Sequence, residues 1–207
     1  MAYEGVIKFK YINEDQSFLI PDDTFKIINP VRQLLKEKDY LGQYPDGISY
    51  GNISIRDKNS NEFYITASDT GKIKDTLSAD YVKITSCDLI NNVCYFKGAA
   101  LPSSETLSHH IIYSYCNEAK AVIHIHNKAL WFKLKDKAPT TATNVEYGTI
   151  EMVNEIINLL QNTNLKNEKI LVMGGHEDGL ISFGGTIDEA YNQISQGFTS
   201  ITLTHTQ

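Results

Sequence analysis

The chain has 207 residues, of which 42% are hydrophobic and 21% charged, a composition typical of a soluble globular protein with a sizeable core. Its net charge of -6 and isoelectric point near 5.5 argue against a general binder of nucleic acid or anionic membranes, because such proteins carry a basic face. The chain has no long apolar run that would predict a membrane-spanning helix. The first residues also lack the basic-then-apolar pattern of a secretion signal.

The cysteines Cys87, Cys94 and Cys116 are scattered, with no close C-x-x-C spacing. An odd, scattered count predicts neither a disulfide framework nor a zinc knuckle. With no secretion signal, we expect a protein of the reducing cytoplasm.

The first part of the chain mixes strand and helix patterns. Residues 5–11 alternate and predict a strand, followed by a loop around residues 21–23. Residues 31–37 carry apolar side chains at helical spacing, and Pro30 suits the first turn of such a helix.

The middle of the chain predicts two pairs of strands. Residues 52–56 alternate cleanly, and residues 62–66 suit a hairpin partner. Residues 81–86 and 93–97 suit a second pair, with Asn91-Asn92 at the turn. A helix then opens after Pro102-Ser-Ser-Glu105, with Ser103 or Ser104 as its N-cap and Glu105 in the first turn, where the helix dipole favours negative charge.

The last part predicts strands at 170–173 and 180–183 and helices at 149–160 and 186–196. The final helix begins at a capping box, Thr186-Ile-Asp-Glu189, and ends at Gly197. The tail 198–207 suits one more strand. Strands dominate the middle and helices flank them, which predicts one α/β or α+β domain over residues 1–207.

Two histidines interrupt the apolar run 121–126, Ala-Val-Ile-His-Ile-His. Side chains alternate along a strand, so His124 and His126 point to one face and the intervening isoleucines to the core. Two such imidazoles can hold one metal ion. His176 is the candidate third ligand, because the glycines around it let the backbone come close to a ligand.

Each of these residues also has a plain structural explanation. A buried histidine is more often hydrogen-bonded than metal-bound, although three imidazoles with an open position are typical of a catalytic zinc site. Glu105 suits a general base beside a cation or a simple helix N-terminal acid. Ser103 and Ser104 suit an anion site or simple caps.

Five motifs, in this order, resemble the class II aldolase/adducin family. They are Gly51-Asn-Ile-Ser-Ile-Arg56, Ile65-Thr-Ala-Ser-Asp-Thr-Gly71, Pro102-Ser-Ser-Glu105, His124-Ile-His126, and Gly175-His176 with Gly184 and Glu189-Ala-Tyr191. The resemblance covers residues 30–195. It implies a single α/β/α domain around a mostly antiparallel nine-stranded sheet, and assembly into homotetramers with active sites at subunit interfaces.

The resemblance also implies site residues. Zinc ligands of the family match His124, His126 and His176, and the acid/base glutamate matches Glu105. The zinc site would also accept another divalent transition metal, such as Co, Ni or Fe. The groups that hold the phosphate of a small sugar substrate match Asn52, Thr70, Gly71, Ser103 and Ser104. The loop at Thr70 is longer than in the family, so Ser68 is an alternative to Thr70.

The implied reaction is retro-aldol cleavage of a phosphorylated ketose through a metal-stabilised enediolate, with Glu105 moving the proton. Two departures accompany it. Typical aldolases of the family carry a tyrosine in a long segment after the His-x-His strand, whereas here the segment between His126 and Tyr147 is short and has none. The family's His-Gly is replaced by His176-Glu-Asp-Gly179, and His205 is expected to lie in an exposed tail.

Three other functions compete with an aldolase. A dehydratase or epimerase of the family would use the same metal and phosphate sites. A non-catalytic, adducin-like assembly module would lose the metal ligands, which this chain keeps. A cupin-like metal barrel would need more strands and no Pro-Ser-Ser-Glu helix.

Overall fold

The computed structural model describes residues 7–58 and 60–199. Its centre is an eight-stranded sheet of order β1-β7-β6-β5-β4-β8-β10-β9. The strands are β1 (Lys10–Asp15), β4 (Asn52–Arg56), β5 (Phe63–Thr66), β6 (Tyr81–Asp88), β7 (Val93–Lys97), β8 (Ala121–His126), β9 (Ile170–Val172) and β10 (Gly179–Gly184). β1 runs parallel to β7, and the other neighbouring pairs are antiparallel. A separate hairpin pairs β2 (Gly42–Gln43) with β3 (Ser49–Tyr50).

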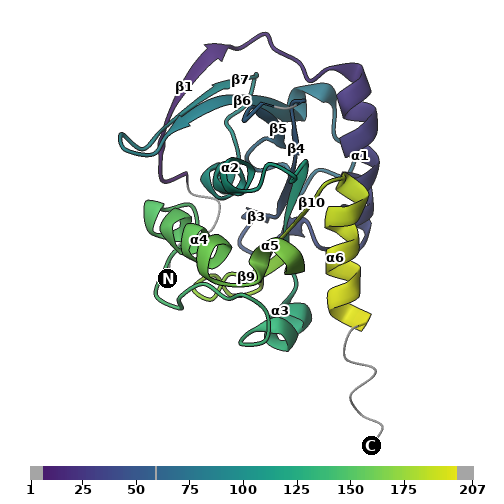
Figure 1. Ribbon diagram of the computed structural model, residues 1–207. Coiled ribbons are helices and arrows are strands. Elements are labelled where there is room, and N and C mark those ends of the chain that lie inside the picture. Colours follow the sequence, from purple (N-terminus) through teal and green to yellow (C-terminus); the bar gives the residue numbers. More distant parts are fainter. Residues whose placement is uncertain (1–6, 59, 200–207) are drawn as a thin grey trace, which may run out of the picture.

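Helices cover both faces of this sheet. They are α1 (Asp22–Glu37), α2 (Thr106–Tyr115), α3 (Lys128–Leu134), α4 (Ile150–Asn162), α5 (Leu165–Glu168) and α6 (Ile187–Thr199), with a short 3-10 helix at Ser78–Asp80. Figure 1 shows α2 and α4 on one side of the sheet and α1 and α6 on the other. The expected mixed α/β class with a mostly antiparallel sheet is therefore confirmed, with eight strands in the described part of the sheet.

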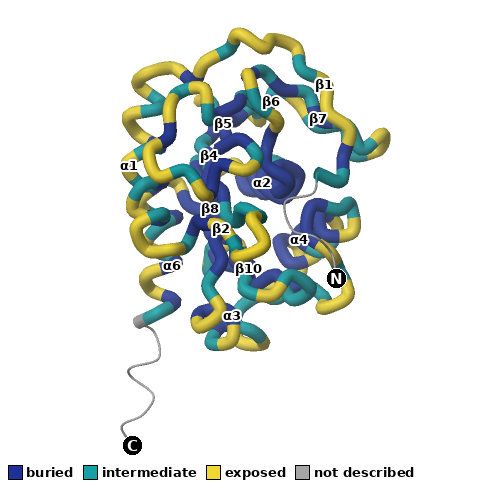
Figure 2. Tube along the Cα trace, turned by 180° about the vertical axis from the view of Figure 1, so that it is seen from behind, coloured by how far each residue is buried: buried dark blue, intermediate teal, exposed yellow. Residues whose placement is uncertain are grey.

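The central strand β8 separates two apolar cores. Val122 packs among residues of α2 and α4, whereas Ile123 and Ile125 pack among residues of α1 and α6. All six residues of β8 are buried, and Figure 2 shows β8, β4 and α2 in the buried interior. The predicted alternation of this strand is thus confirmed, with both of its faces covered.

Most predicted strands are confirmed within one or two residues. β4 and β5 form the expected antiparallel hairpin, with Ser54 opposite Ile65. β6 and β7 form the second pair, and Asn92 at their turn has a positive φ of 52°. The first strand was expected at residues 5–11, but it begins only at Lys10 and runs to Asp15; residues 5 and 6 of the expected segment lie outside the described residues.

The predicted start of the first long helix is wrong. α1 begins at Asp22, with Asp22 and Asp23 in the first turn, and Pro30 lies inside it. A proline removes the donor to the carbonyl four residues earlier, here Lys26. Both Lys26 and Pro30 are exposed, so that carbonyl remains accessible to water and the helix continues.

The predicted end of the last helix is also wrong, because α6 continues past Gly197 to Thr199. A Cβ at Gly197 would lie 3.1 Å from Leu130 Cδ1 and 3.3 Å from Leu134 Cδ1. The glycine therefore allows α6 to approach α3, a helix that the sequence analysis did not predict. The expected tail strand and His205 fall on residues 200–207, outside the described part. No helix within 7–58 or 60–199 has the length and apolar character needed to cross a bilayer.

Arg32 of α1 is fully buried and joins this helix to the loop that follows β5. One guanidinium nitrogen donates to the carbonyl of Thr70 at 2.7 Å and also to that of Ile73, and another donates to Lys74 O at 2.9 Å. Burial lowers the pKa of Arg32, with partial compensation from nearby acidic groups. Main-chain carbonyls thus solvate this guanidinium and fix the Thr70 loop.

Replacing Arg32 by Met should lower the free energy of unfolding by about 2–4 kcal/mol, because hydrogen bonds to a charged group contribute about 1.5–3 kcal/mol each and the carbonyls would lose their donor. Urea denaturation measures this change. Lys26→Met, at an exposed position of the same helix, is the matched control. Equal stability of the two variants would show that Arg32 does not hold the loop.

Candidate active site

Three histidines converge between the sheet and the turn that joins β9 to β10. The Nε2 atoms of His124 and His126 are 3.0 Å apart, and His176 Nε2 lies 3.0 Å from His126 Nε2. Candidate ligand atoms of all three lie within 4.8 Å of one another. Nitrogens bound at about 2.0–2.1 Å to one tetrahedral zinc ion lie about 3.3 Å apart, so this donor set fits a single divalent ion. His176 is thus next to the strand pair, as the sequence analysis expected.

The other ring nitrogens of the strand histidines are hydrogen-bonded. His124 Nδ1 lies 3.0 Å from the carbonyl oxygen of Leu180, and His126 Nδ1 lies 2.7 Å from the hydroxyl of Tyr44. Such outer partners fix the tautomer and ring orientation of a metal-binding histidine.

Burial governs the protonation of the cluster. It is the main cause that lowers the pKa of His126, to about 3, and those of His124 and His176 well below the usual value. Neighbouring imidazoles lower the pKa of His124 and His176 further. All three rings are therefore neutral near pH 7, which is the state that binds metal.

Glu105 lies at the start of α2 and is 2% exposed. It occupies the N-cap position, so the prediction that Ser103 or Ser104 caps this helix is wrong. The Glu105 side chain makes no capping hydrogen bond; its Oε2 accepts one from the Ser108 hydroxyl at 2.7 Å. The chain therefore places a carboxylate, rather than a capping hydroxyl, at the helix entrance.

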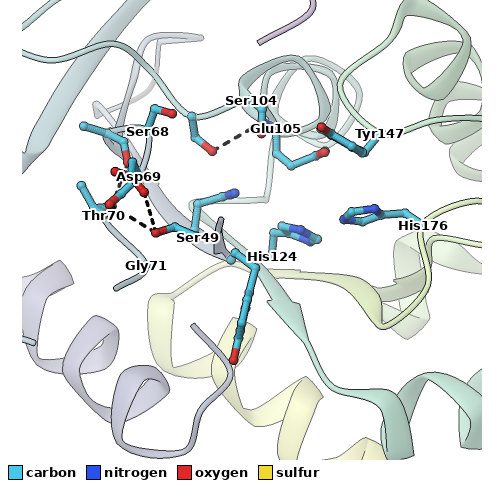
Figure 3. Close-up of a pocket in the computed structure, with 15 residues that line it drawn as sticks. Ser49, Ser68, Asp69, Thr70, Gly71, Ser104, Glu105, His124, Tyr147 and His176 are labelled. Carbon is cyan, nitrogen blue, oxygen red and sulfur yellow. Dashed lines mark hydrogen bonds between the residues drawn. The ribbon is translucent and has the colours of Figure 1, made fainter. Parts of the chain in front are cut away.

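One pocket contains the candidate residues except His126. Its described lining is Ser49, Tyr50, Gly51, Asn52, Ala67, Ser68, Asp69, Thr70, Gly71, Ser103, Ser104, Glu105, His124, Tyr147 and His176. Figure 3 shows Glu105, Tyr147, His124 and His176 at one end and Ser68, Asp69, Thr70 and Gly71 at the other. The pocket thus has an end lined by histidines and a carboxylate, and a small, polar end.

Asn52 is 4% exposed, and its Oδ1 has no hydrogen-bond partner among the described residues. A buried polar atom of this kind usually has a ligand or water as partner. Asn52 lines the pocket and is paired with His124 across β4 and β8, so it lies beside the histidine cluster.

At the polar end, the Thr70 hydroxyl donates to the carbonyl of Ala67 at 2.8 Å and so holds the loop together. Ser68, which also lines the pocket, is then the better hydroxyl for a ligand. Asp69 accepts a hydrogen bond from Ser49 Oγ at 2.8 Å and forms an ion pair with Lys72. The Lys72 ammonium thus partly neutralises the charge of Asp69, the carboxylate at this end of the pocket.

Several residues around the histidine cluster were not predicted as site residues. Tyr44 and Tyr50 pack their rings against His126, with ring centroids 5.9 and 5.2 Å away, and Tyr147 packs against His176 at 4.8 Å. Tyr44 and Tyr50 lie at the two ends of residues 44–50, to which the sequence analysis assigned no site role. Tyr50 directly precedes the Gly51 motif, which is a signal that could have identified it, whereas Tyr44 has no such neighbour in the sequence.

The comparisons with known proteins agree with this fold. Residues 46–197 match the family model "Class II Aldolase and Adducin N-terminal domain". An L-fuculose 1-phosphate aldolase superposes with a TM-score of 0.65 at 19% identity, over 88% of this chain and 85% of that one. The enzyme of that name from Thermus thermophilus gives 0.58 at 19% identity, over 85% and 90%.

A third similar structure is YgbL from Klebsiella pneumoniae, which is assigned no more closely than aldolase, epimerase or decarboxylase. It gives a TM-score of 0.61 at 14% identity, over 86% of this chain and 88% of that one. No curated protein sequence matches the chain. These identities show the fold alone, whereas the family model covers most of the sequence. The chain therefore belongs to the class II aldolase and adducin N-terminal domain family.

Proposed function

We propose that this protein is a metal-dependent aldehyde-lyase that cleaves a small phosphorylated ketose by a retro-aldol reaction. The observation that carries the proposal is the cluster of three neutral imidazoles, two of which line one pocket together with a buried carboxylate, Glu105. His124, His126 and His176 would hold the ion. Zinc suits three imidazoles best, although another divalent transition metal would also fit.

The chemistry that a bound divalent cation supplies is positive charge beside the substrate carbonyl and its adjacent hydroxyl, which stabilises the enediolate left by cleavage. Glu105 moves the proton to and from the enediolate carbon. Its contact with Ser108 fixes the orientation of the carboxylate. The buried position of Glu105 keeps bulk water from competing for that proton.

The polar end of the pocket would bind the phosphate. Ser68, Ser103 and Ser104 offer hydroxyls, and the backbone N–H groups at the N-terminus of α2 favour negative charge. No lysine or arginine is among the described lining residues. Neutral donors would therefore hold the anion, together with Asn52 and the backbone at Gly71.

Two other functions share parts of this site. An epimerase or dehydratase acting on a sugar phosphate would use the same metal and phosphate groups, and the similarity to YgbL keeps this alternative open. A non-catalytic, adducin-like assembly module would not need the three histidines or Glu105, so their convergence favours an enzyme. We further propose a single domain over residues 1–207 that acts in the cytoplasm as a homotetramer.

The purified protein should contain about one divalent ion per chain, as expected for a three-histidine site, and His124→Ala should lose both the ion and activity. Elemental analysis measures the metal. His110→Ala, outside the histidine cluster, is the control and should keep both. An active, metal-free His124→Ala variant would disprove the metal site.

Glu105→Gln should keep the metal but slow proton exchange by about 100-fold or more, because a general base contributes about 10²–10⁴-fold. The probe is dihydroxyacetone phosphate, the ketone that cleavage of a ketose 1-phosphate releases. Incorporation of solvent deuterium into its hydroxymethyl carbon is followed by NMR. Wild-type exchange rates in the variant would mean that another group moves the proton.

The double variant Ser103→Ala/Ser104→Ala should raise KM for L-fuculose 1-phosphate, or for another phosphorylated ketose that the enzyme cleaves. Turnover of the unphosphorylated sugar should not change, because only the phosphate contacts are removed. Ser114→Ala, later on α2, is the control. An unchanged KM would show that phosphate is not the group bound at this end.

A further inference from the structure

The small β2–β3 hairpin brings a side chain, that of Tyr44, against the histidine cluster. The turn between its strands is closed by backbone hydrogen bonds from Tyr44 N to Ile48 O and from Gly47 N to Tyr44 O, at 2.8 and 2.9 Å. Tyr44 packs on Tyr50 of the same hairpin, with ring centroids 4.6 Å apart. The Tyr44 hydroxyl is thereby held 2.7 Å from Nδ1 of His126.

The geometry of the cluster determines which ring nitrogen of His126 carries the proton. Its Nε2 faces the Nε2 atoms of both His124 and His176 at 3.0 Å. With a shared ion bound, the Nε2 lone pair of His126 would point at the ion, so the ring proton would be on Nδ1. Nδ1–H would then donate to the phenolic oxygen of Tyr44.

The two strand histidines have outer partners of different kinds. His124 Nδ1 faces a main-chain carbonyl, that of Leu180 on the neighbouring strand β10. The partner of His126 is instead a side chain of a hairpin outside the main sheet. A substitution can therefore remove the second contact without altering the sheet.

We propose that Tyr44 is a positioning residue of the metal centre, which orients His126 for metal binding through its phenolic oxygen. The inference rests on the metal site of the proposed function. It extends that site to the β2–β3 hairpin, which also reaches the polar end of the pocket. There a Cβ at Gly71 would lie 2.4 Å from Tyr50 O and 2.7 Å from Gly42 O, so the hairpin backbone lies directly against the Thr70-Gly71 loop.

The test compares zinc affinities of the wild type and Tyr44→Phe, by competition with a chromophoric chelator. Phenylalanine keeps the ring that packs on Tyr50 and His126 and removes only the oxygen. The zinc dissociation constant should rise about 10–100-fold, as is usual when an outer partner of a ligating histidine is lost. Tyr95→Phe, which removes the same atom from β7, should leave the affinity unchanged.

A second measurement distinguishes a change in the orientation of the His126 ring from a general loss of protein stability. Cobalt-loaded Tyr44→Phe should show a shifted visible absorption band, because the imidazole donor has moved, while the melting temperature of the metal-free protein stays near that of the wild type. A Tyr44→Phe variant with wild-type affinity and spectrum would overturn the inference and leave the metal site intact. A wild type that binds no zinc would overturn the metal site as well.

If Tyr44→Phe does not fold, the tautomer can be measured in the zinc-loaded wild type by nitrogen-15 NMR of the histidine side chains. We expect His126 to be protonated at Nδ1, with that proton in a hydrogen bond. Protonation at Nε2 would contradict the inference without any variant.

Discussion

The register of β8 against its two neighbours is the constraint on which the site depends. Asn52 of β4 lies opposite His124 on one side, and Gly179 of β10 lies opposite His126 on the other. Because side chains alternate, a slip of one residue would turn both histidines into the opposite core and bring isoleucines into the pocket. The apolar residues on both faces of β8 thus fix the register, and the register fixes the histidine cluster relative to the polar end of the pocket.

Burial sets the protonation state of the histidine cluster. Removing the imidazoles from water disfavours their charged form, so their pKa values fall and each ring presents a lone pair near neutral pH. The same burial surrounds Glu105. Neutral donors beside a buried carboxylate form a site in which a divalent cation would interact strongly, because little solvent screens its charge.

Sequence reasoning predicted the parts of the molecule that follow strict periods. Alternation and turn chemistry predicted the strand containing His124 and His126, the β4–β5 hairpin and the proximity of His176. The errors lie where packing overrides a local signal. Pro30 does not begin a helix because its exposed position tolerates the lost hydrogen bond, and Gly197 does not end one because α6 needs it to pack on α3. Tyr44 could not be predicted, since its contact with His126 depends on how the hairpin folds onto β8.

The loop before α4 shows how the third histidine and the carboxylate, distant in sequence, are kept in one pocket. A Cβ at Gly175, next to His176, would lie 2.1 Å from Val145 O, and a Cβ at Gly148 would lie 2.8 Å from Ser104 O, next to Glu105. Because the backbone approaches closely at these two glycines, one loop packs against both the turn that carries His176 and the chain before Glu105. The same loop carries Tyr147 into the pocket. The segment after His126 contains no tyrosine before Tyr147, and Tyr147 itself places a phenol against His176.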